Sequence, residues 1–408
     1  MKIFNRKLKR TSFALLTLCM VFVMTACAEN SSQPEKSQPT EQTTVQPTTM
    51  SAEEINDRKL DKFISDMTLE EKVGQMFFVR CPDEDAVKQV SKYNIGGYIL
   101  FGRDFDGKTK DEVVDDIHSY QNEADIPLLI GVDEEGGTVV RVSSNPNLRE
   151  TPFLSPKDTY ADGGWDAVKQ DAEEKADLLL SLGINVNLAP VCDMTSDEYG
   201  FMYDRSFSSD VDMENRYVRT VVETSKSKKL GTVLKHFPGY GNNSDTHTGI
   251  AYDDRDYSEF ENTDFKPFYQ GIESGADCIL VSHNIVNCMD SEYPASLSQK
   301  VHDILRNEFK FDGVIMTDDL IMDAITDFTG DEAAAVTAAK CGNDLLCCSS
   351  VDTQYPAVLE AVQNGEIPEA QVDASVKRIL KWKQNLGIFN IDTYQKKVRT
   401  TDPTDATE

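Results

Sequence analysis

Eight short apolar segments alternate with amphipathic stretches along most of this 408-residue chain. Amphipathic stretches of about 10–20 residues, such as those at 167–183 and 215–231, separate most of the segments and have the periodicity of surface helices. Near-continuous apolar strands separated by helices are typical of parallel strands that are covered on both faces. The apolar segments lie at residues 76–80, 96–101, 127–133, 185–193, 231–237, 278–283, 313–319 and 344–349.

This pattern predicts an α/β fold in which a (β/α)8 barrel of the TIM type forms a single catalytic domain over residues 54–392. Eight strand–helix units match the number that closes such a barrel. A doubly wound open sheet is the alternative. It is disfavoured because no phosphate-binding motif of the GxGxxG or GxxxxGK type follows a strand.

Polar and charged residues stand where five of the apolar segments end. In a (β/α)8 barrel the active site lies at the carboxyl ends of the strands. One polar residue there could be a helix cap or a turn residue, but caps would be Ser, Thr or Asn as readily as Lys or His. The five endings therefore predict one functional site. They are Asp133, Asp193, Lys235 with His236, Ser282 with His283, and Asp318.

A glycine-rich loop after the fifth segment carries a carboxylate and an imidazole two residues apart. The sequence at 235–249 is KHFPGYGNNSDTHTG, and its Pro-Gly-Tyr-Gly interrupts regular structure. A carboxylate beside an imidazole is a common way to tune the pKa of a proton donor. Asp245 and His247 are therefore candidate proton-transfer residues. The alternative is a turn with polar surface residues.

The N-terminal segment has the layout of a secretory signal. Residues 2–10 are basic and contain no acid, and an apolar run follows at about 13–24. The sequence Met-Thr-Ala-Cys at 24–27 resembles a bacterial lipoprotein cleavage box, with Met24 where Leu is usual. The resemblance implies a signal peptide at 1–26 and a lipid on Cys27. An ordinary signal and a retained membrane anchor are the alternatives.

The segment after this cysteine predicts a tether. Residues 28–50 are Ser, Thr, Gln, Pro and Glu with little apolar content, so 27–53 is expected to be a flexible linker behind the lipidated cysteine. The tail at 393–408 is also polar. We therefore expect the domain to be anchored to the membrane, at the extracellular face of a bacterial cell.

Composition limits the partners. The formal charge is −29, and removal of five basic residues with the leader makes the mature chain −29 − 5 = −34. Such an acidic surface argues against nucleic acid and anionic wall polymers, and favours a neutral or small substrate. The nine cysteines have neither a disulfide framework nor metal-ligand spacing. Cys278, Cys341, Cys347 and Cys348 read as small core residues. A monomer without a cofactor or metal is expected.

Several ordered motifs resemble family 3 glycoside hydrolases, and within them the β-N-acetylglucosaminidase branch in its barrel-only lipoprotein form. KHFPGYG followed by D-T-H is one such motif. The others are MTLEEKVGQM at 67–76, GVDEEGG at 131–137, NLAPVCDM at 187–194, RSFS at 205–208, GVIMTDDL at 313–320 and VKRILKWKQNLGIF at 376–389. The likeness covers nearly the whole predicted domain. It departs at Tyr240, where the family often has His, and in a loop that is one residue shorter before Asp245.

The resemblance implies a role for each matching residue. Asp318 matches the catalytic nucleophile, His247 the general acid/base and Asp245 its partner. Four residues match those that hold the hydroxyls of the terminal sugar: Asp133, Arg205, Lys235 and His236. Cationic neighbours such as Lys235 and Arg205 would keep Asp318 ionised, and Asp245 would raise the pKa of His247.

The sequence thus predicts an exo-acting, retaining β-N-acetylhexosaminidase that removes terminal N-acetylglucosamine from wall-derived or other glycans. Three alternatives stay open. They are a β-glucosidase-type exo-glycosidase, a glycoside phosphorylase of the same family, and a non-catalytic glycan-binding lipoprotein.

The sequence gives less support for a catalytic or substrate-binding role of the remaining polar residues. The vicinal carboxylates Glu134 and Glu135 precede two glycines and are expected to belong to a tight turn. His283 would either line the pocket or be a core histidine. The others are assigned structural or surface roles: Asp193 orders neighbouring cations, Asp319 and Asp323 are structural or supply charge at a helix start, and His118 and His302 lie at the surface.

Overall fold

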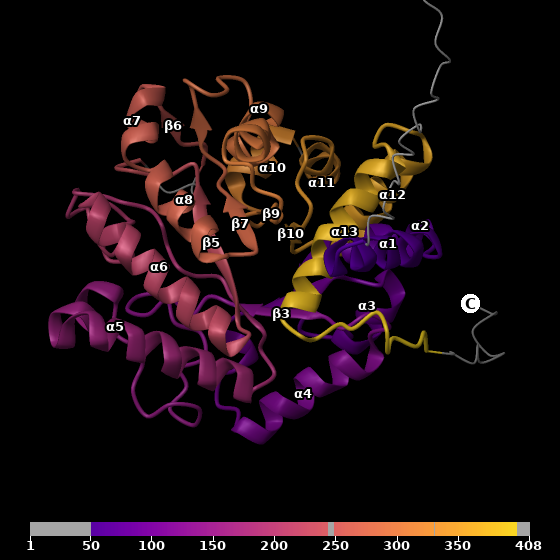
Figure 1. Ribbon diagram of the computed structural model, residues 1–408, viewed down its shortest axis with the longest axis horizontal. Helices are drawn as coiled ribbons and strands as arrows, with labels where there is room; N and C mark the ends of the chain where they lie inside the picture. Colours follow the sequence, from indigo (N-terminus) through magenta and orange to yellow (C-terminus); the bar gives the residue numbers. More distant parts are fainter. Residues whose placement is uncertain (1–49, 244–248, 330, 398–408) are drawn as a thin grey trace, which may run out of the picture. The chain divides into compact units, whose positions relative to one another are not determined.

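The computed structural model of the chain describes residues 50–243, 249–329 and 331–397. The chain divides into two units, Met1–Met50 and Ser51–Glu408, and the fold below belongs to the second unit (Figure 1). The predicted leader, Cys27 and most of the tether lie outside the described residues, as do Asp245 and His247.

Eight parallel strands form one sheet in the order β10-β1-β2-β3-β4-β5-β7-β9. A parallel bridge from Met316 to Leu345 joins the two ends of this order, so the sheet closes into a barrel. The predicted (β/α)8 barrel is therefore confirmed. The strands are β1 (Phe77–Arg80), β2 (Gly97–Leu100), β3 (Leu129–Val132), β4 (Val186–Asn187), β5 (Gly231–Phe237), β7 (Cys278–Val281), β9 (Val314–Thr317) and β10 (Leu346–Cys348).

Helices between the strands surround the barrel (Figure 1). Several begin at the capping signals of the sequence: Ser51, Thr68 and Thr109 each form a capping box with a Glu three residues later. The helices are α1 (Ala52–Ser65), α2 (Leu69–Gln75), α3 (Ala86–Tyr93), α4 (Lys110–Glu123), α5 (Pro156–Ser181), α6 (Val211–Lys228), α7 (Tyr257–Asn262), α8 (Phe265–Ser274), α9 (Gln299–Asp303), α10 (Asp323–Thr329), α11 (Asp331–Lys340), α12 (Val351–Gln363) and α13 (Glu369–Asn385). A small sheet of β6 (Tyr252–Asp253) and β8 (Ile285–Val286) lies outside the barrel order.

Successive residues of each strand pack into different layers. Phe78 belongs to the cluster inside the barrel, whereas its neighbours Phe77 and Val79 pack in the layer beneath the helices. This alternation explains why the strands read as continuous apolar segments. A Cβ atom at Gly131 would lie 2.5 Å from Cζ of Phe78, so only glycine leaves room for that ring inside the barrel.

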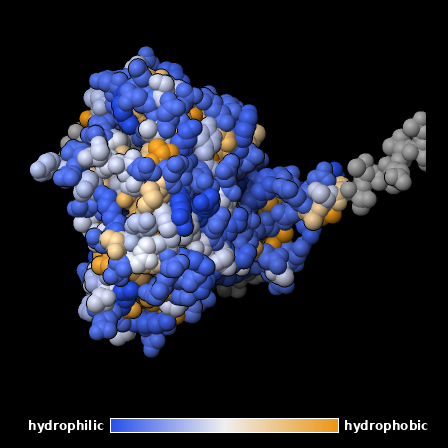
Figure 2. Space-filling view, turned by 60° about the vertical axis from the view of Figure 1, so that its left-hand side comes forward, coloured by the Kyte–Doolittle hydropathy of each residue, from blue (hydrophilic) through white to orange (hydrophobic). Residues whose placement is uncertain are grey.

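The surface has the polar character that the composition predicts. The face in Figure 2 is largely hydrophilic, with apolar residues in small patches. No helix within the described ranges is long and apolar enough to cross a membrane. The prediction that His302 lies at the surface is wrong: it is 2 % exposed, because its ring lies against Cys341 and Gly342, which follow α11, and its Nδ1 donates to the Ser298 carbonyl. His118 is exposed as expected.

The cysteines of the described residues are all free thiols. Cys278, Cys341, Cys347 and Cys348 are buried, which confirms their assignment to the core.

Candidate active site

The alternation inside the barrel decides which side chains enter the site. Residues two positions beyond an inward-facing core residue face the same side of a strand. Val233 and Met316 belong to the interior cluster, and Lys235 and Asp318 follow them at this spacing. Asp133 follows the interior residue Leu129 by four positions, so it has the same orientation. The predicted residues therefore converge at the carboxyl ends of the strands.

A compact cluster of two carboxylates and two cations lies at this end of the barrel. Lys235 Nζ is 2.6 Å from Asp133 Oδ1 and 2.6 Å from Glu135 Oε1. Arg205 donates from Nε and Nη2 to the two oxygens of Glu135, at 2.9 and 2.8 Å. Glu135 thus links both cations. The sequence analysis did not predict this role, because it read both vicinal carboxylates as parts of a turn.

The turn itself is present and holds Glu135 in place. Gly136 has φ +104°, and a Cβ there would lie 2.1 Å from the Leu154 carbonyl oxygen, so the turn requires glycine. Lys175 of α5 donates to the Glu135 carbonyl at 2.9 Å. Glu134 points elsewhere and accepts hydrogen bonds from the backbone N–H groups of Arg141 and Val142. The turn assignment is therefore correct for Glu134 and incomplete for Glu135.

Attraction between opposite charges stabilises the ionised forms of this buried cluster. Burial opposes ionisation of Glu135, but the charges of Lys235 and Arg205 outweigh it and hold the pKa of this carboxyl well below its usual range. Burial also opposes protonation of Lys235, but Asp133 and Glu135 outweigh it and raise the lysine pKa. Arg205 behaves similarly, since burial is outweighed by Glu135 and its pKa is raised. All three groups are therefore charged at neutral pH.

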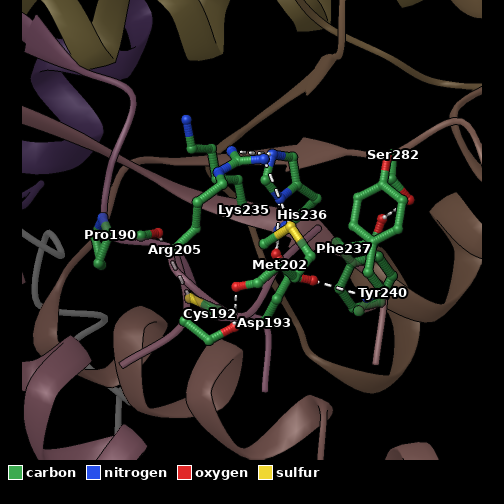
Figure 3. Close-up of polar contacts among 12 residues, drawn as sticks. Pro190, Cys192, Asp193, Met202, Arg205, Lys235, His236, Phe237, Tyr240 and Ser282 are labelled. Atoms are coloured by element: carbon green, nitrogen blue, oxygen red, sulfur yellow. Dashed lines mark hydrogen bonds and ion pairs between the residues drawn. The ribbon is translucent and has the colours of Figure 1, made fainter. Parts of the chain in front are cut away.

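His236 is fixed by a buried carboxylate behind it. Asp193 is 0 % exposed, and its Oδ2 lies 2.7 Å from His236 Nδ1 and accepts the His236 backbone N–H at 3.0 Å (Figure 3). Its Oδ1 accepts the Tyr240 N–H at 2.7 Å. When Nδ1 donates to Asp193, Nε2 lies 3.3 Å from Arg205 Nη2, where it can accept a hydrogen bond. Asp193 thus orders the imidazole directly, and its charge also contributes to the raised pKa of Arg205, after the larger effects of burial and Glu135.

Asp318 lies beyond the end of β9. Its backbone N–H donates to the Val281 carbonyl at 3.1 Å, and its Oδ1 accepts the Asp319 N–H at 2.9 Å. Asp319 accepts the Ser349 hydroxyl at 2.6 Å, and burial raises its pKa. Among the described residues, every ion pair of Lys235 and Arg205 goes to Asp133 or Glu135. The expected lowering of the Asp318 pKa by these two cations therefore stays a prediction.

These residues surround one cavity of ≈ 310 Å³, within the range of small-ligand sites. Asp133, Arg205, Lys235, His236 and Asp318 all line it, and so does Glu135. It is also lined by residues that the sequence analysis did not single out: Arg80, Phe101 and Arg141. The spacing of two from Phe78 to Arg80 would have been a signal for the first of these. A second, more apolar cavity of ≈ 240 Å³ beside α1 and Tyr394 contains none of the strand-end residues.

Of the other predicted candidates, Asp319 lines this cavity, whereas His283 and Asp323 do not. His283 is fully buried, with Nδ1 at 2.7 Å from Ser296 Oγ and Nε2 at 3.0 Å from the Asp319 carbonyl, so it packs in the core below the site. Asp323 begins α10. Asp245 and His247 lie outside the described residues, so their position relative to Asp318 stays a prediction. No group of three or more His, Cys, Asp or Glu within the described ranges could hold a metal ion.

A family model supports the resemblance. The model described as glycosyl hydrolase family 3 N terminal domain matches residues 68–382. Two curated relatives illustrate the match. A beta-hexosaminidase of Nitrosomonas eutropha is 32 % identical over 273 residues, which cover 65 % of this chain and 77 % of that protein. The beta-hexosaminidase LpqI of Mycobacterium tuberculosis is 31 % identical over 331 residues, covering 77 % and 82 %.

Solved structures agree with these relatives. A family 3 beta-N-acetylglucosaminidase from Paenibacillus sp. superposes with a TM-score of 0.74 at 29 % identity, and the match covers 84 % of this chain and 66 % of that one. LpqI of M. tuberculosis gives a TM-score of 0.72 at 26 % identity and covers 79 % and 96 %.

Proposed function

The chain belongs to glycosyl hydrolase family 3, and we propose that it is an exo-acting β-N-acetylhexosaminidase that removes terminal N-acetylglucosamine with retention of configuration. The observation that carries this proposal is the position of Asp318. It lines the same cavity as Asp133, Arg205, Lys235 and His236, from another strand. Asp133, Glu135, Arg205 and Lys235 form a charge-balanced cluster, which we call the sugar clamp. A carboxylate in the same cavity as this clamp can supply the nucleophile that a retaining glycosidase requires.

The clamp positions the terminal sugar. Asp133 and Glu135 are acceptors, Arg205 and Lys235 are donors, and all four are held by one another before substrate arrives. Hydroxyl groups of a sugar both donate and accept, so they can bond this mixed set. Because the cluster is preorganised, little conformational entropy is lost when the ring binds.

The first step forms a bond between Asp318 and the anomeric carbon. As this bond forms, the bond from that carbon to the leaving oxygen breaks, and protonated His247 supplies the proton to the departing oxygen. The Asp245 carboxylate would favour the imidazolium form beforehand. In the second step neutral His247 accepts a proton from water, which displaces Asp318 and releases the sugar with its original configuration.

Two measurements test this function. Hydrolysis of a panel of aryl β-glycosides, with and without phosphate, identifies the sugar and separates hydrolysis from phosphorolysis. A 2-fluoro glycoside that traps the covalent intermediate should label Asp318, located by peptide mass spectrometry. Label on Glu134, Glu135 or Asp319 would refute the assignment of the nucleophile, and absence of any label and turnover would favour a non-catalytic glycan binder.

We further propose that the domain is a monomer tethered to the outer face of the membrane by a lipid on Cys27. The leader, the cleavage box and the polar linker of the sequence support this proposal. The Cys27→Ser variant should leave the membrane fraction for the medium or persist as an uncleaved precursor. A wild-type protein that is wholly soluble in the cytosol would contradict it.

A further inference from the structure

His283 is a buried histidine that has no role in the proposed reaction. It lies just beyond the end of β7, and its side chain is 0 % exposed. Its Nε2 lies 3.0 Å from the Asp319 carbonyl oxygen, and its Nδ1 lies 2.7 Å from Ser296 Oγ. A carbonyl oxygen can only accept a hydrogen bond, so the first contact requires a proton on Nε2. The ring therefore donates to the residue that directly follows the proposed nucleophile.

Asp319 connects this histidine to Asp318. Its backbone N–H donates to Asp318 Oδ1 at 2.9 Å, so the direction of this N–H bears on the orientation of the nucleophilic carboxylate. The carbonyl of the same residue accepts from His283, and its carboxylate accepts the Ser349 hydroxyl at 2.6 Å. His283 follows β7 and Ser349 follows β10, and these two strands flank β9 in the closed barrel.

The main chain does not bond Asp319 itself to the flanking strands. Backbone hydrogen bonds of 3.1 and 3.0 Å join the residues on either side of it to β7 and β10. The Asp319 carbonyl also accepts the N–H of the residue three positions later, at 3.1 Å, but this bond lies within one turn and moves with the segment. Of the hydrogen bonds of Asp319 in the described part of the chain, those to His283 and Ser349 alone reach another strand end.

We propose that His283 and Ser349 are positioning residues for the nucleophile. By holding the carbonyl and the carboxylate of Asp319, they keep its N–H directed at the Asp318 carboxylate. This proposal rests on the hexosaminidase function above, in which Asp318 forms a bond to the anomeric carbon. The attacking oxygen must lie about 3–3.5 Å from that carbon with its orbitals aligned, so a carboxylate that turns away reacts more slowly.

The competing role for His283 is packing in the core alone. The two roles differ in their kinetics. The sugar is bound by the clamp, whose residues belong to β5 or follow β3 and β4. Loss of a contact that orients the nucleophile should therefore lower kcat and kcat/KM by the same factor and leave KM unchanged. Loss of packing should lower stability without this selective effect.

Two substitutions separate the two ring nitrogens of His283. The side-chain NH2 group of Gln can take the place of Nε2, whereas that of Asn reaches only the place of Nδ1. His283→Gln should therefore keep the donor to the Asp319 carbonyl and stay within about 3-fold of the wild-type kcat on an aryl β-N-acetylglucosaminide. His283→Asn should lower kcat by about 10-fold or more and keep KM within about 2-fold, because a buried acceptor loses its donor.

The rate of covalent labelling reports the same step directly. With a 2-fluoro glycoside, the bond from Asp318 to the anomeric carbon forms as the bond from that carbon to the aryl leaving group breaks. Labelling of His283→Asn should be slowed by the same factor as kcat. The inhibition constant of free N-acetylglucosamine should not change, because this ligand needs the clamp and forms no bond to Asp318.

His302→Gln is the matched control. His302 is also a buried histidine, 2 % exposed, and its Nδ1 donates to the Ser298 carbonyl at 2.7 Å, but it does not line the cavity that contains Asp318. Gln at this position loses the Nδ1 donor, so Tm should fall. The labelling rate and kcat should remain at the wild-type values at a temperature where the variant is folded.

Ser349→Ala is the second test, which keeps the proposal falsifiable if His283→Asn does not fold. It should lower kcat with KM unchanged, because the Asp319 carboxylate loses its hydroxyl donor. The proposal is overturned if His283→Asn, or Ser349→Ala in its place, keeps the wild-type labelling rate. It is also overturned if the Gln and Asn variants of His283 slow labelling equally. A wild type that neither hydrolyses aryl β-N-acetylglucosaminides nor takes up label would refute the proposed function instead.

Discussion

Replacing Glu135 by Gln tests whether one carboxylate organises the sugar clamp. Its side chain is 2 % exposed and makes three charge-assisted contacts, at 2.6, 2.8 and 2.9 Å, to Lys235 and Arg205. Gln has nearly the same shape, but it offers one acceptor and turns an NH2 group toward a cation. After the change Lys235 keeps Asp133 at 2.6 Å, whereas Arg205 loses one of its two charge-assisted hydrogen bonds, because an NH2 group replaces one of the two acceptor oxygens.

The contacts set the size of the effect. Removing one partner of a buried ion pair destabilises a protein by about 3–5 kcal/mol, and the low end applies here because Lys235 keeps a partner. A domain of about 350 residues unfolds with an entropy of about 0.7 kcal/mol/K, so about 3 kcal/mol lowers Tm by about 4 °C. Misplacement of Arg205 and Lys235 by an ångström should lower kcat/KM by about 10²-fold.

The assay is thermal unfolding from pH 8 to pH 3 together with kcat/KM on an aryl substrate. The cations depress the folded pKa of Glu135, so its contribution to the free energy of unfolding is complete above the unfolded value of about 4.3 and is lost as the pH falls below it. The Tm difference between wild type and variant should therefore be constant from pH 8 to about pH 5 and shrink below about pH 4.

Glu174→Gln is the control, because Glu174 pairs with Arg149 at the surface, where such a pair contributes about 0–1 kcal/mol. Its Tm should fall by no more than about 1.5 °C, and its activity should be unchanged. If Glu135→Gln behaves like this control, or if its Tm difference already shrinks between pH 7 and pH 5, the clamp does not depend on an ionised Glu135 and the reasoning is wrong.

Three further predictions follow from other residues. Asp193→Asn should lower kcat/KM by about 10-fold, mainly through KM, because His236 loses the charged acceptor that fixes its tautomer; an unchanged KM across pH 6–8 would contradict this. Burial lowers the pKa of Lys383 to about 7, a shift of about 3.5 units, so the folded chain binds fewer protons than the unfolded chain between pH 7 and 10.5, and the wild-type free energy of unfolding should rise with pH across this window. Lys383→Met should be more stable than wild type by at most about 5 kcal/mol near pH 7, and by progressively less toward pH 10.5 in urea titrations, with surface Lys381→Met as the control. His247→Ala should slow aryl glycosides with poor leaving groups far more than activated ones; equal slowing of all substrates would remove His247 as the proton donor.

The hydrophobic pattern predicted the barrel because each strand alternates between two buried layers and so reads as one apolar segment. The same alternation explains why Asp133, Lys235 and Asp318 could be assigned to one site. A charged side chain that follows the inward-facing core residues of its strand points into the cavity at the end of the barrel. Glu135 was not predicted, because its orientation depends on the turn at Gly136 and on Lys175 of α5, forty residues away in sequence. His302 was misassigned for a related reason, since its ring is covered by Cys341, 39 residues away in sequence, and by Gly342.

The net charge of the whole chain differs from the net charge of the groups that line the cavity. The chain is at −29, which led to the expectation of a neutral substrate. The cavity itself balances four carboxylates with four cations. The carboxylates are Asp133, Glu135, Asp318 and Asp319, and the cations are Arg80, Arg141, Arg205 and Lys235.

Surface charges are screened over about 8 Å at physiological ionic strength, so acidic groups on the outer helices contribute little to the potential at Asp318. The cations inside the cavity are closer and less screened. Those of the clamp pair with Asp133 and Glu135, and the charge of Arg80 acts on Asp319, so the cations of the cavity are balanced by carboxylates within it. The net charge of the chain therefore does not determine the charge of the ligand that the cavity accepts, because the groups that line the cavity are closer to the ligand and less screened.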